Sequence, residues 1–345
     1  MRFLIVGLGS IGQRHVRNLR RLYGNDVEIL AYRSRGLNVV IHDDMTAEFG
    51  IVPEERFLLR RCLSLKAALE ERPEAVFITN PTSLHISTAI TAAQAGSHLF
   101  IEKPISNNLS QIEELEAAVS RKNLTLLVGY QLRFHPALRK IAELIHQDRI
   151  GRMISARLEF GEYLPDTHPY ENYEQGCAAR KDLGGGVVLC FSHELDCVYW
   201  LFGMPRKVAA IGGHLSSLKM DAADVASILL ECNQGSHAFP VHVHLDFLQK
   251  PARRRIEVLG EGGRILWDYY ANELQVLSGN GEKEIENVAG FERNQLFLAE
   301  LKHFARCLEG GERPVVSLKD GVASLKIALA ATESMETGKV IELNP

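Results

Sequence analysis

The N-terminal stretch RFLIVGLGSIG, residues 2–12, decides the fold of this chain of 345 residues. Its apolar run is typical of a buried parallel strand, and residues 10–23 continue with helical periodicity. A strand, a glycine-rich turn and a helix in this order are the context that a dinucleotide-binding fingerprint requires. The alternative interpretation is a tight strand-to-helix turn that holds no ligand.

Each glycine of this turn has a distinct physical task in a dinucleotide site. Gly7 permits a sharp turn, Gly9 lets the backbone approach a pyrophosphate, and Gly12 lets the helix pack closely on the strand. The helix begins at Ser10 and Ile11, and the N–H groups of its first turn favour an anion. We therefore predict that Gly7, Gly9, Ser10, Ile11 and Gly12 bind the dinucleotide.

The end of the second predicted strand, residues 27–31, indicates which dinucleotide is bound. An NAD site carries Asp or Glu there, roughly 20 residues after the glycines, to hold the ribose 2′-hydroxyl. This chain instead has Arg33, Ser34 and Arg35, and the first acidic residue that follows is Asp43. Because arginine binds phosphate oxygens in pairs, the pattern favours the 2′-phosphate of NADP, with NAD as the alternative. A solvated basic turn is the other interpretation.

Composition and charge indicate an ordinary globular enzyme of two domains. Hydrophobic residues make up 46% and charged residues 24% of a chain that is long enough for ample core. The net charge of −4 argues against nucleic acid as a partner, and no apolar run approaches the roughly 20 residues that span a membrane. The six cysteines form no Cys-x-x-Cys pair, so we expect reduced thiols in the core. Because Met1 leads directly into a strand, we expect no signal peptide and a cytoplasmic location.

Strands and helices alternate along the first third of the chain. Further strands are predicted at 74–78, 98–101 and 125–128, and helices at 83–95 and 109–121. This alternation predicts an α/β domain over residues 1–123, a Rossmann domain built on a doubly wound parallel sheet.

The pattern changes in residues 124–345. A helix at 136–147 precedes several strands separated by glycine-rich turns, and helices at 292–309 and 318–337 close the chain. The strands are predicted at 153–160, 206–212, 225–232, 237–247, 254–259 and 264–268. We therefore predict an α+β domain with a mixed or antiparallel sheet, in which a short turn at 233–236 joins a hairpin.

Short motifs near the predicted strand ends resemble those of a known family. The motif Glu102-Lys103-Pro104 directly follows a strand, and Asn80-Pro81 follows the strand before it. In the second domain DLGGG at 182–186 precedes SHELD at 192–196, and PVVS lies at 314–317. With the glycine fingerprint, their order and spacing resemble the Gfo/Idh/MocA family of NAD(P)-dependent oxidoreductases over nearly the whole chain.

The resemblance implies a cleft in which Lys103 and His193 act as catalytic groups on a sugar or sugar-like alcohol. Hydride transfer from an alcohol carbon needs a group that takes the hydroxyl proton, and a partly desolvated lysine at a sheet edge can do so. The cofactor contacts that we predict near these strand ends are Asn80, Pro81, His85, Glu102 and Lys103.

One position departs from the pattern of the family. Many members carry an aspartate three or four residues before the histidine, where this chain has Leu189 and Cys190. Neither side chain can orient an imidazole as a carboxylate does, and Cys190 is expected to be a plain buried thiol. Asp182 and Asp166 are candidates to replace the carboxylate from another loop.

A long polar and aromatic segment, residues 161–173, precedes the glycines of the second domain. It resembles a substrate loop of family members linked to bacterial surface-sugar pathways, and aromatic rings and charged groups suit sugars and phosphates. A structured surface loop is the alternative interpretation. The predicted substrate-binding residues are Gln131, Arg133, Tyr163, Asp166, Arg180 and His193.

His242 and His244 alternate with apolar residues and therefore share one strand face. Such a pair can ligate zinc, but the sequence offers no evident third ligand, so we predict no metal site. A polar sheet face or a subunit interface explains the pair better. Members of the family commonly associate through this face, so we expect a homo-oligomer, a dimer or tetramer, formed through the C-terminal sheet.

The predicted activity is hydride transfer between a nicotinamide cofactor and a hydroxyl or ketone of a carbohydrate or nucleotide sugar. An NAD-assisted glycoside hydrolase of the same family is one alternative, and it would keep its nicotinamide tightly bound. A non-catalytic dinucleotide-responsive binding protein is the other. The presence of both Lys103 and His193 argues against the binding protein, whereas the missing aspartate argues for it.

Overall fold

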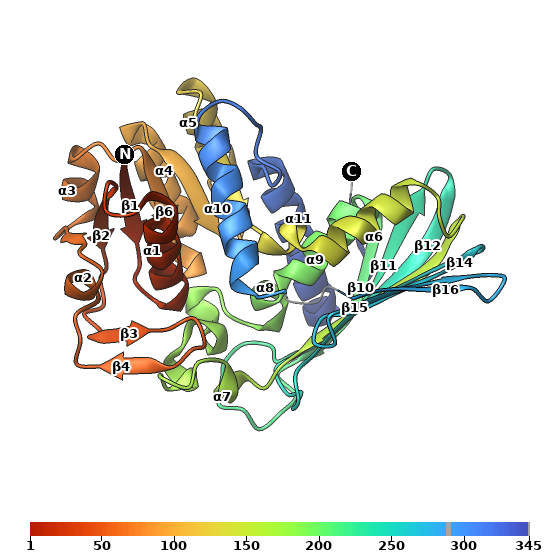
Figure 1. The fold of residues 1–345 in the computed structure, drawn as a ribbon. Helices are drawn as coiled ribbons and strands as arrows, with labels where there is room; N and C mark the ends of the chain where they lie inside the picture. The colour runs from red at the N-terminus through yellow and green to blue at the C-terminus, as the bar shows by residue number, and fades with distance from the viewer. Residues whose placement is uncertain (288–290, 344–345) are drawn as a thin grey trace. The chain divides into compact units, whose positions relative to one another are not determined.

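The computed structural model describes residues 1–287 and 291–343, which form two compact units (Figure 1). The first unit contains Met1–Gln131, His168–Glu171 and Arg293–Val322, and the second contains the other described residues. Both units are therefore discontinuous along the chain, whereas the sequence predicts one boundary at 123/124. The difference arises because two later segments return to the first unit.

A six-stranded sheet with the order β5-β2-β1-β6-β7-β8 forms the centre of the first unit as described. All of its neighbouring strands pair in parallel, which confirms the predicted Rossmann architecture. The strands are β1 (Arg2–Val6), β2 (Glu28–Tyr32), β5 (Arg60–Arg61), β6 (Ala75–Ile78), β7 (His98–Glu102) and β8 (Leu126–Gly129). The helices are α1 (Ser10–Tyr23), α2 (Pro53–Arg56), α3 (Leu65–Glu70), α4 (His85–Ala95), α5 (Ile112–Arg121) and α10 (Asn294–Leu308).

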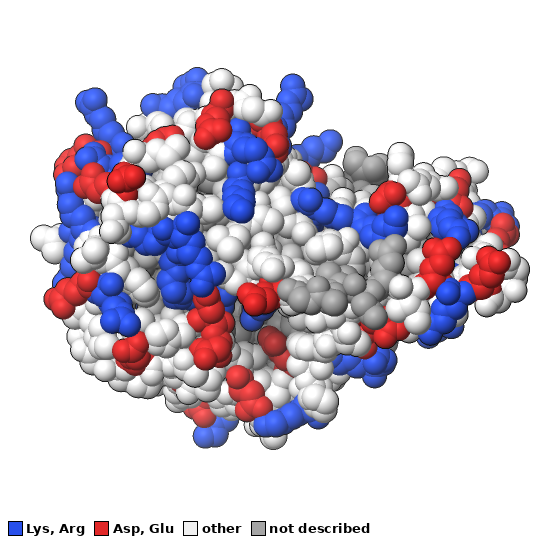
Figure 2. Space-filling model, in the orientation of Figure 1, with Lys and Arg blue, Asp and Glu red and all other residues white. Residues whose placement is uncertain are grey.

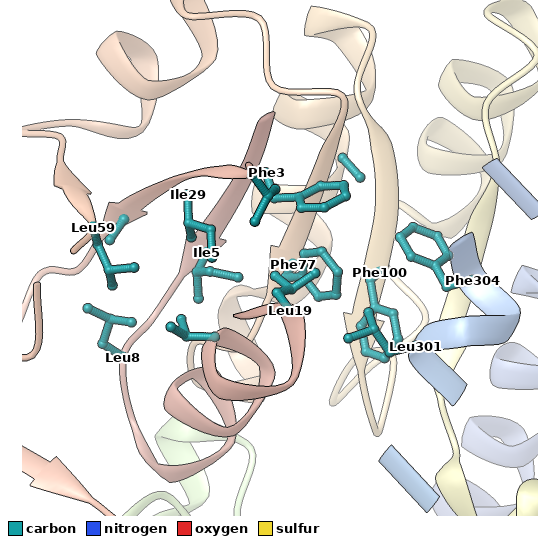
Figure 3. Close-up of a cluster of buried hydrophobic side chains, with 14 of the residues drawn as sticks. Phe3, Ile5, Leu8, Leu19, Ile29, Leu59, Phe77, Phe100, Leu301 and Phe304 are labelled. Atoms are coloured by element: carbon teal, nitrogen blue, oxygen red, sulfur yellow. The ribbon is translucent and has the colours of Figure 1, made fainter. Parts of the chain in front are cut away.

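Aromatic side chains explain why α10 belongs to the first unit. Phe77 of β6 and Phe100 of β7 stack with ring centroids 5.0 Å apart, and Phe304 of α10 meets both edge-on (Figure 3). Leu301 joins the same cluster one turn earlier on α10. Full burial of each such side chain contributes about 1.5–3 kcal/mol, so several of them hold the returning helix on the sheet.

A nine-stranded sheet forms the second unit as described, with the order β16-β15-β14-β13-β9-β12-β11-β10-β17. Among its neighbouring strands β9 and β12 pair in parallel and the others antiparallel, which confirms a mixed sheet and the hairpin of β11 with β12. The strands are β9 (Met153–Gly161), β10 (Lys207–Gly213), β11 (Val225–Gln234), β12 (His237–Asp246), β13 (Arg253–Gly260), β14 (Gly263–Asp268), β15 (Glu273–Ser278), β16 (Lys283–Asn287) and β17 (Ile341–Glu342).

Helices cover one face of this sheet, and the other face, called the open face below, carries exposed and half-exposed side chains in the part of the chain that the structure describes. The helices α8 and α9 pack on β11 and β12, and α9 also packs on β9 and against α6. Val241 and Val243 of β12 are buried on the covered face, whereas His242 and His244 are half-exposed on the other. The helices are α6 (Pro136–His146), α7 (Leu164–Thr167), α8 (Val187–Cys190), α9 (Ser192–Phe202) and α11 (Leu318–Thr337), and α11 begins within the first unit.

Several short elements are absent from the sequence prediction. They are the hairpin of β3 (Val39–Ile41) and β4 (Ala47–Phe49), together with α2, α3, β5, α7, β15, β16 and β17. Most are too short for a periodic pattern, and tertiary packing decides whether they form. No helix within the described residues is long and apolar enough to cross a membrane. Basic and acidic side chains are interspersed over the face seen in Figure 2.

The cysteines are only partly in the core. Cys197, Cys232 and Cys307 are buried, as predicted, but Cys62, Cys177 and Cys190 are half-exposed. The prediction of a buried thiol at Cys190 is therefore wrong: this residue ends the short helix α8, of which Val187 and Val188 are the buried residues. The six residues form no disulfide with one another.

Candidate active site

The register of the parallel sheet brings four strand ends into one row. Val6 pairs with Tyr32 on one side and Ile78 on the other, and Ile78 pairs with Ile101. The residues that follow these positions therefore emerge together at the carboxyl edge of the sheet. In open α/β sheets this edge is where ligands bind.

The glycine turn packs closely against backbone at Gly7 and Gly12 and is open at Gly9. Gly7 has φ +99°, and a Cβ there would lie 2.8 Å from the carbonyl oxygen of Thr79. A Cβ on Gly12 would lie 2.1 Å from the Gly7 carbonyl oxygen, so this position requires glycine for packing. By contrast, a Cβ on Gly9 would meet no atom within 4 Å. Gly9 is the N-cap residue of α1, so the open space beside it lies at the start of the helix. A dinucleotide pyrophosphate fits such a position, because the N–H groups of the first helical turn favour an anion.

The arginines after β2 do not act alike. The guanidinium group of Arg33 donates two hydrogen bonds to the carboxylate of Glu54 in α2, with N···O distances of 2.8 and 2.7 Å. Both side chains are largely buried. Ser34 and Arg35 are exposed. Arg33 is thus already engaged by a carboxylate, which the sequence does not predict because Glu54 lies 21 residues further along the chain.

His85 joins the loops that follow β6 and β7. Its Nε2 and Nδ1 atoms lie 2.8 and 2.9 Å from the backbone oxygens of Asn80 and Pro104. Burial lowers the pKa of His85, while the two carbonyl groups act to raise it. The side chain therefore ties the predicted cofactor loops together, with Pro81 lying between Asn80 and the helix that carries His85.

A buried carboxylate precedes the lysine of the family motif. Glu102 lies 2.7 Å from Nε2 of His15, and His15 is enclosed by Phe77 and Phe100. Lys103 is half-buried at the edge of the sheet. His15 was missed by the sequence analysis, although its spacing of three residues after Gly12 is a signal that it faces the sheet.

His193 lies in the first turn of α9 and is buried in the second unit. Its neighbour Glu194 pairs with Arg254 at 2.6 Å. Further along the helix, Asp196 accepts two hydrogen bonds from Arg133, at 2.9 and 2.7 Å, and both side chains are buried. Arg133 is therefore part of a buried ion pair. Lys103 and His193 belong to different compact units, in accordance with the sequence analysis.

The predicted substrate segment carries exposed charge pairs. Asp166 lies 2.5 Å from Nζ of Lys250, which also lies 5.3 Å from the ring centre of Tyr163. Arg180 pairs with Asp182 through two contacts of 2.9 and 2.5 Å. Both carboxylates proposed to replace the missing aspartate are thus paired with cations of the second unit. Gln131, in contrast, is buried in the first unit.

Two residues of this segment that were not predicted as site residues belong to the first unit. His168 is near Lys103 and Arg293. Burial is the main cause that lowers the pKa of His168 to about 4, and the two positive charges lower it further. Burial raises the pKa of Tyr170 to about 12, and its hydroxyl is within hydrogen-bonding reach of Ser10. The sequence carries no signal for these contacts, because they depend on how a loop returns to a distant helix.

A groove of about 490 Å³ lies elsewhere, on the open face of the second sheet. Its lining includes Arg253 with Glu159 and Arg255 with Asp268, two ion pairs of 3.0 and 2.5 Å, and none of the residues predicted for the active site. Within the described part of the chain no cluster of His, Cys, Asp or Glu has the arrangement of a metal site.

Comparisons with known proteins agree with this architecture. Residues 1–130 match the "Oxidoreductase family, NAD-binding Rossmann fold" and residues 142–343 match the "Oxidoreductase family, C-terminal alpha/beta domain" of Gfo/Idh/MocA proteins. Myo-inositol 2-dehydrogenase of Thermotoga maritima is 26% identical, over 99% of this chain and 98% of the relative. D-xylose 1-dehydrogenase (NADP(+)) 2 of Haloferax volcanii is 24% identical, over 100% of both chains.

A solved structure of the WlbA dehydrogenase from Bordetella pertussis, in complex with NADH and UDP-GlcNAcA, has the same fold. Its TM-score is 0.79 at 21% identity, and the match covers 100% of this chain and 99% of that one. The chain belongs to the Gfo/Idh/MocA family of oxidoreductases. It is an NAD(P)-dependent oxidoreductase, and the comparisons support neither the hydrolase nor the binding-protein alternative.

Proposed function

We propose that this protein oxidises a CH–OH carbon of a sugar or nucleotide sugar to a ketone, or reduces that ketone, with Lys103 as the group that exchanges the hydroxyl proton. The observation that carries the proposal is the row of strand ends, where the open glycine turn and the Glu102-Lys103 motif emerge at one sheet edge. Inositol and sugar dehydrogenases among the relatives support this class of substrate. A bound nicotinamide supplies or accepts the hydride.

We assign different parts of the proton and hydride transfer reaction to Lys103, Glu102 and His193. Lys103 is half-buried at the end of β7, and in this proposal its amine takes or returns the hydroxyl proton. In this proposal Glu102, tied to His15, holds the loop that presents the lysine. His193 serves as a second acid–base group on the substrate, and the Arg133–Asp196 pair fixes the helix that carries it.

The substrate is proposed to meet the polar segment of the second unit. Tyr163 offers an aromatic face, and Asp166 and Arg180 offer charged hydrogen-bonding groups. Gln131 of the first unit is proposed to offer an amide. Arg133 acts indirectly in this scheme, because both of its forked contacts go to Asp196.

NADP(H) is the preferred cofactor in this proposal, and NAD(H) is the weaker alternative. No carboxylate follows β2 directly, and Arg35 and Ser34 are exposed there to meet a 2′-phosphate. Because Glu54 neutralises Arg33, the preference rests on Arg35 and is expected to be moderate. Asn80 and Pro81 complete the proposed cofactor contacts from the neighbouring loop, where His85 supports them.

Two glycine variants test the proposed dinucleotide site. Gly9→Ala should keep the free energy of unfolding within about 1 kcal/mol, because its methyl group has space, but should weaken NADPH and NADH binding about tenfold or more. Gly12→Ala should instead destabilise the protein by about 1–3 kcal/mol or more, because its methyl group collides with backbone. Fluorescence titration and chemical denaturation give the two readouts. Unchanged cofactor affinity in Gly9→Ala would disprove binding at this turn.

We also propose a homo-oligomer, a dimer or tetramer, formed through the open face of the second sheet. Ile211 and Leu229 are exposed there by 83% and 52%, and β12 adds His242 and His244 to the same face. Apolar side chains on an uncovered sheet face are typical of an interface. A cytoplasmic location remains a prediction from the sequence.

The sedimentation velocity of the purified protein tests the proposed oligomer. The protein is expected to sediment as a dimer or larger at micromolar concentration, and Leu229→Arg is expected to shift it to smaller species by placing a charge in the interface. The control Leu63→Arg changes a residue that is 87% exposed in the first unit and should leave the mass unchanged. A wild-type monomer under these conditions would contradict the proposal.

A further inference from the structure

The four residues His168–Glu171 form a compact turn that belongs to the first unit, although the chain on both sides belongs to the second. The Glu171 N–H donates to the His168 carbonyl oxygen at 3.1 Å, and the His168 and Tyr170 rings are 5.6 Å apart. The His168 imidazole and the Glu171 carboxylate approach to 3.8 Å. Their three side chains are therefore held together as a short strap.

The neighbours of the strap follow the edge of the Rossmann sheet in order. Glu171 is within electrostatic reach of Arg35, which follows β2, and Tyr170 lies at Ser10, which follows β1. His168 is near Lys103, which follows β7. In the sheet the order of these strands is β2, β1, β6, β7, so the strap runs along the same edge as the proposed dinucleotide site.

The charge at the β2 end differs from that of either standard dinucleotide site. A carboxylate on the second strand selects the ribose 2′-hydroxyl of NAD, and an arginine accommodates the 2′-phosphate of NADP. Here Arg33 is neutralised by Glu54, so Arg35 is the nearby cation, and the carboxylate within its electrostatic reach is Glu171, from a remote part of the chain that belongs to the same compact unit. A carboxylate so placed attracts Arg35 and repels a phosphate dianion.

We propose that the strap His168–Glu171 covers the dinucleotide groove and that Glu171 is a specificity-determining residue that opposes the 2′-phosphate of NADP(H). The inference rests on the proposed function, because it assumes that the dinucleotide lies along this sheet edge. The preference between NADPH and NADH is then a balance between Arg35, which favours the phosphate, and Glu171, which disfavours it.

Direct binding of NADPH and NADH to the purified full-length protein, followed by fluorescence, tests this balance. Glu171→Gln removes the negative charge at nearly constant shape and should raise the ratio of NADPH to NADH affinity about five- to tenfold. Glu171→Lys should raise it further, and Arg35→Ala should lower it about tenfold. The matched control is Glu174→Gln, which removes a carboxylate three residues later that pairs with Lys219 in the second unit.

A second control alters the strap without altering its charge. Tyr170→Phe removes the hydroxyl beside Ser10 and should leave the affinity ratio unchanged, because the pyrophosphate is common to both cofactors. A ratio that stays within twofold of wild type in both Glu171 variants overturns the inference while leaving the dinucleotide site intact. Failure of the wild-type protein to bind either cofactor overturns the proposed function itself, and the inference with it.

Discussion

Lys103→Met is expected to lower turnover on the true substrate by about 10²–10⁴, because a positioned acid–base group is lost while the shape of the side chain is nearly kept. Dinucleotide affinity should change little, since the glycine turn and Arg35 lie at other strand ends. The measurement combines steady-state kinetics on an inositol or sugar substrate with fluorescence titration of the cofactor. The pattern expected is a fall in kcat with a nearly constant Kd for NADPH.

A matched surface variant separates this effect from a general loss of charge. Lys66→Met changes an exposed lysine of α3 in the same compact unit and should leave kcat unchanged. If Lys103→Met retained near-normal turnover, the lysine would not be the proton acceptor, whatever the cofactor affinity. Catalysis would then have to be sought at His193 on α9.

Arg133→Met is expected to destabilise the second unit by about 3–5 kcal/mol. The substitution leaves the carboxylate of Asp196 buried without its forked cation, and an uncompensated buried charge is far more costly than a lost surface pair. Chemical denaturation followed by a probe in the second unit measures the loss. If Arg133 bound only substrate, the variant would instead unfold like wild type and show a raised KM.

Two further variants make this test specific. Arg180→Met removes the cation of an exposed pair with Asp182 and should cost less than about 1 kcal/mol. In the double variant Arg133→Met with Asp196→Leu, no buried charge is left alone, so most of the stability should return. Equal losses in the single and double variants would mean that the ion pair is not the source of the effect.

Local patterns in the sequence determine much of the fold because they depend on residues close together in the chain. Gly7 is required by the positive φ of its turn, and Gly12 by a close contact of the helix with the carbonyl oxygen of Gly7, five residues earlier. The alternation of strands and helices predicts the parallel sheet, and the order of strands then brings Lys103 to the edge that holds the glycine turn.

The roles of the charged side chains depend on partners that no local sequence pattern predicts. Arg33 looks like a phosphate ligand until the fold brings Glu54 beside it, and Arg133 looks like a substrate ligand until α9 presents Asp196 63 residues later. A long charged side chain has several possible partners in the sequence. In the folded chain it pairs with the one that lies nearest in space, because leaving a buried charge unpaired costs free energy of folding.

The sequence by itself therefore determined the family, the two kinds of sheet and the positions of Lys103 and His193 on their elements. Only the tertiary structure decided which cations are already neutralised and that His168–Glu171 returns to the dinucleotide-binding unit. The physical reason is the range of the interactions: backbone geometry and hydrophobic periodicity act over a few residues, whereas the partners of buried charges and returning loops are chosen by packing across the whole chain.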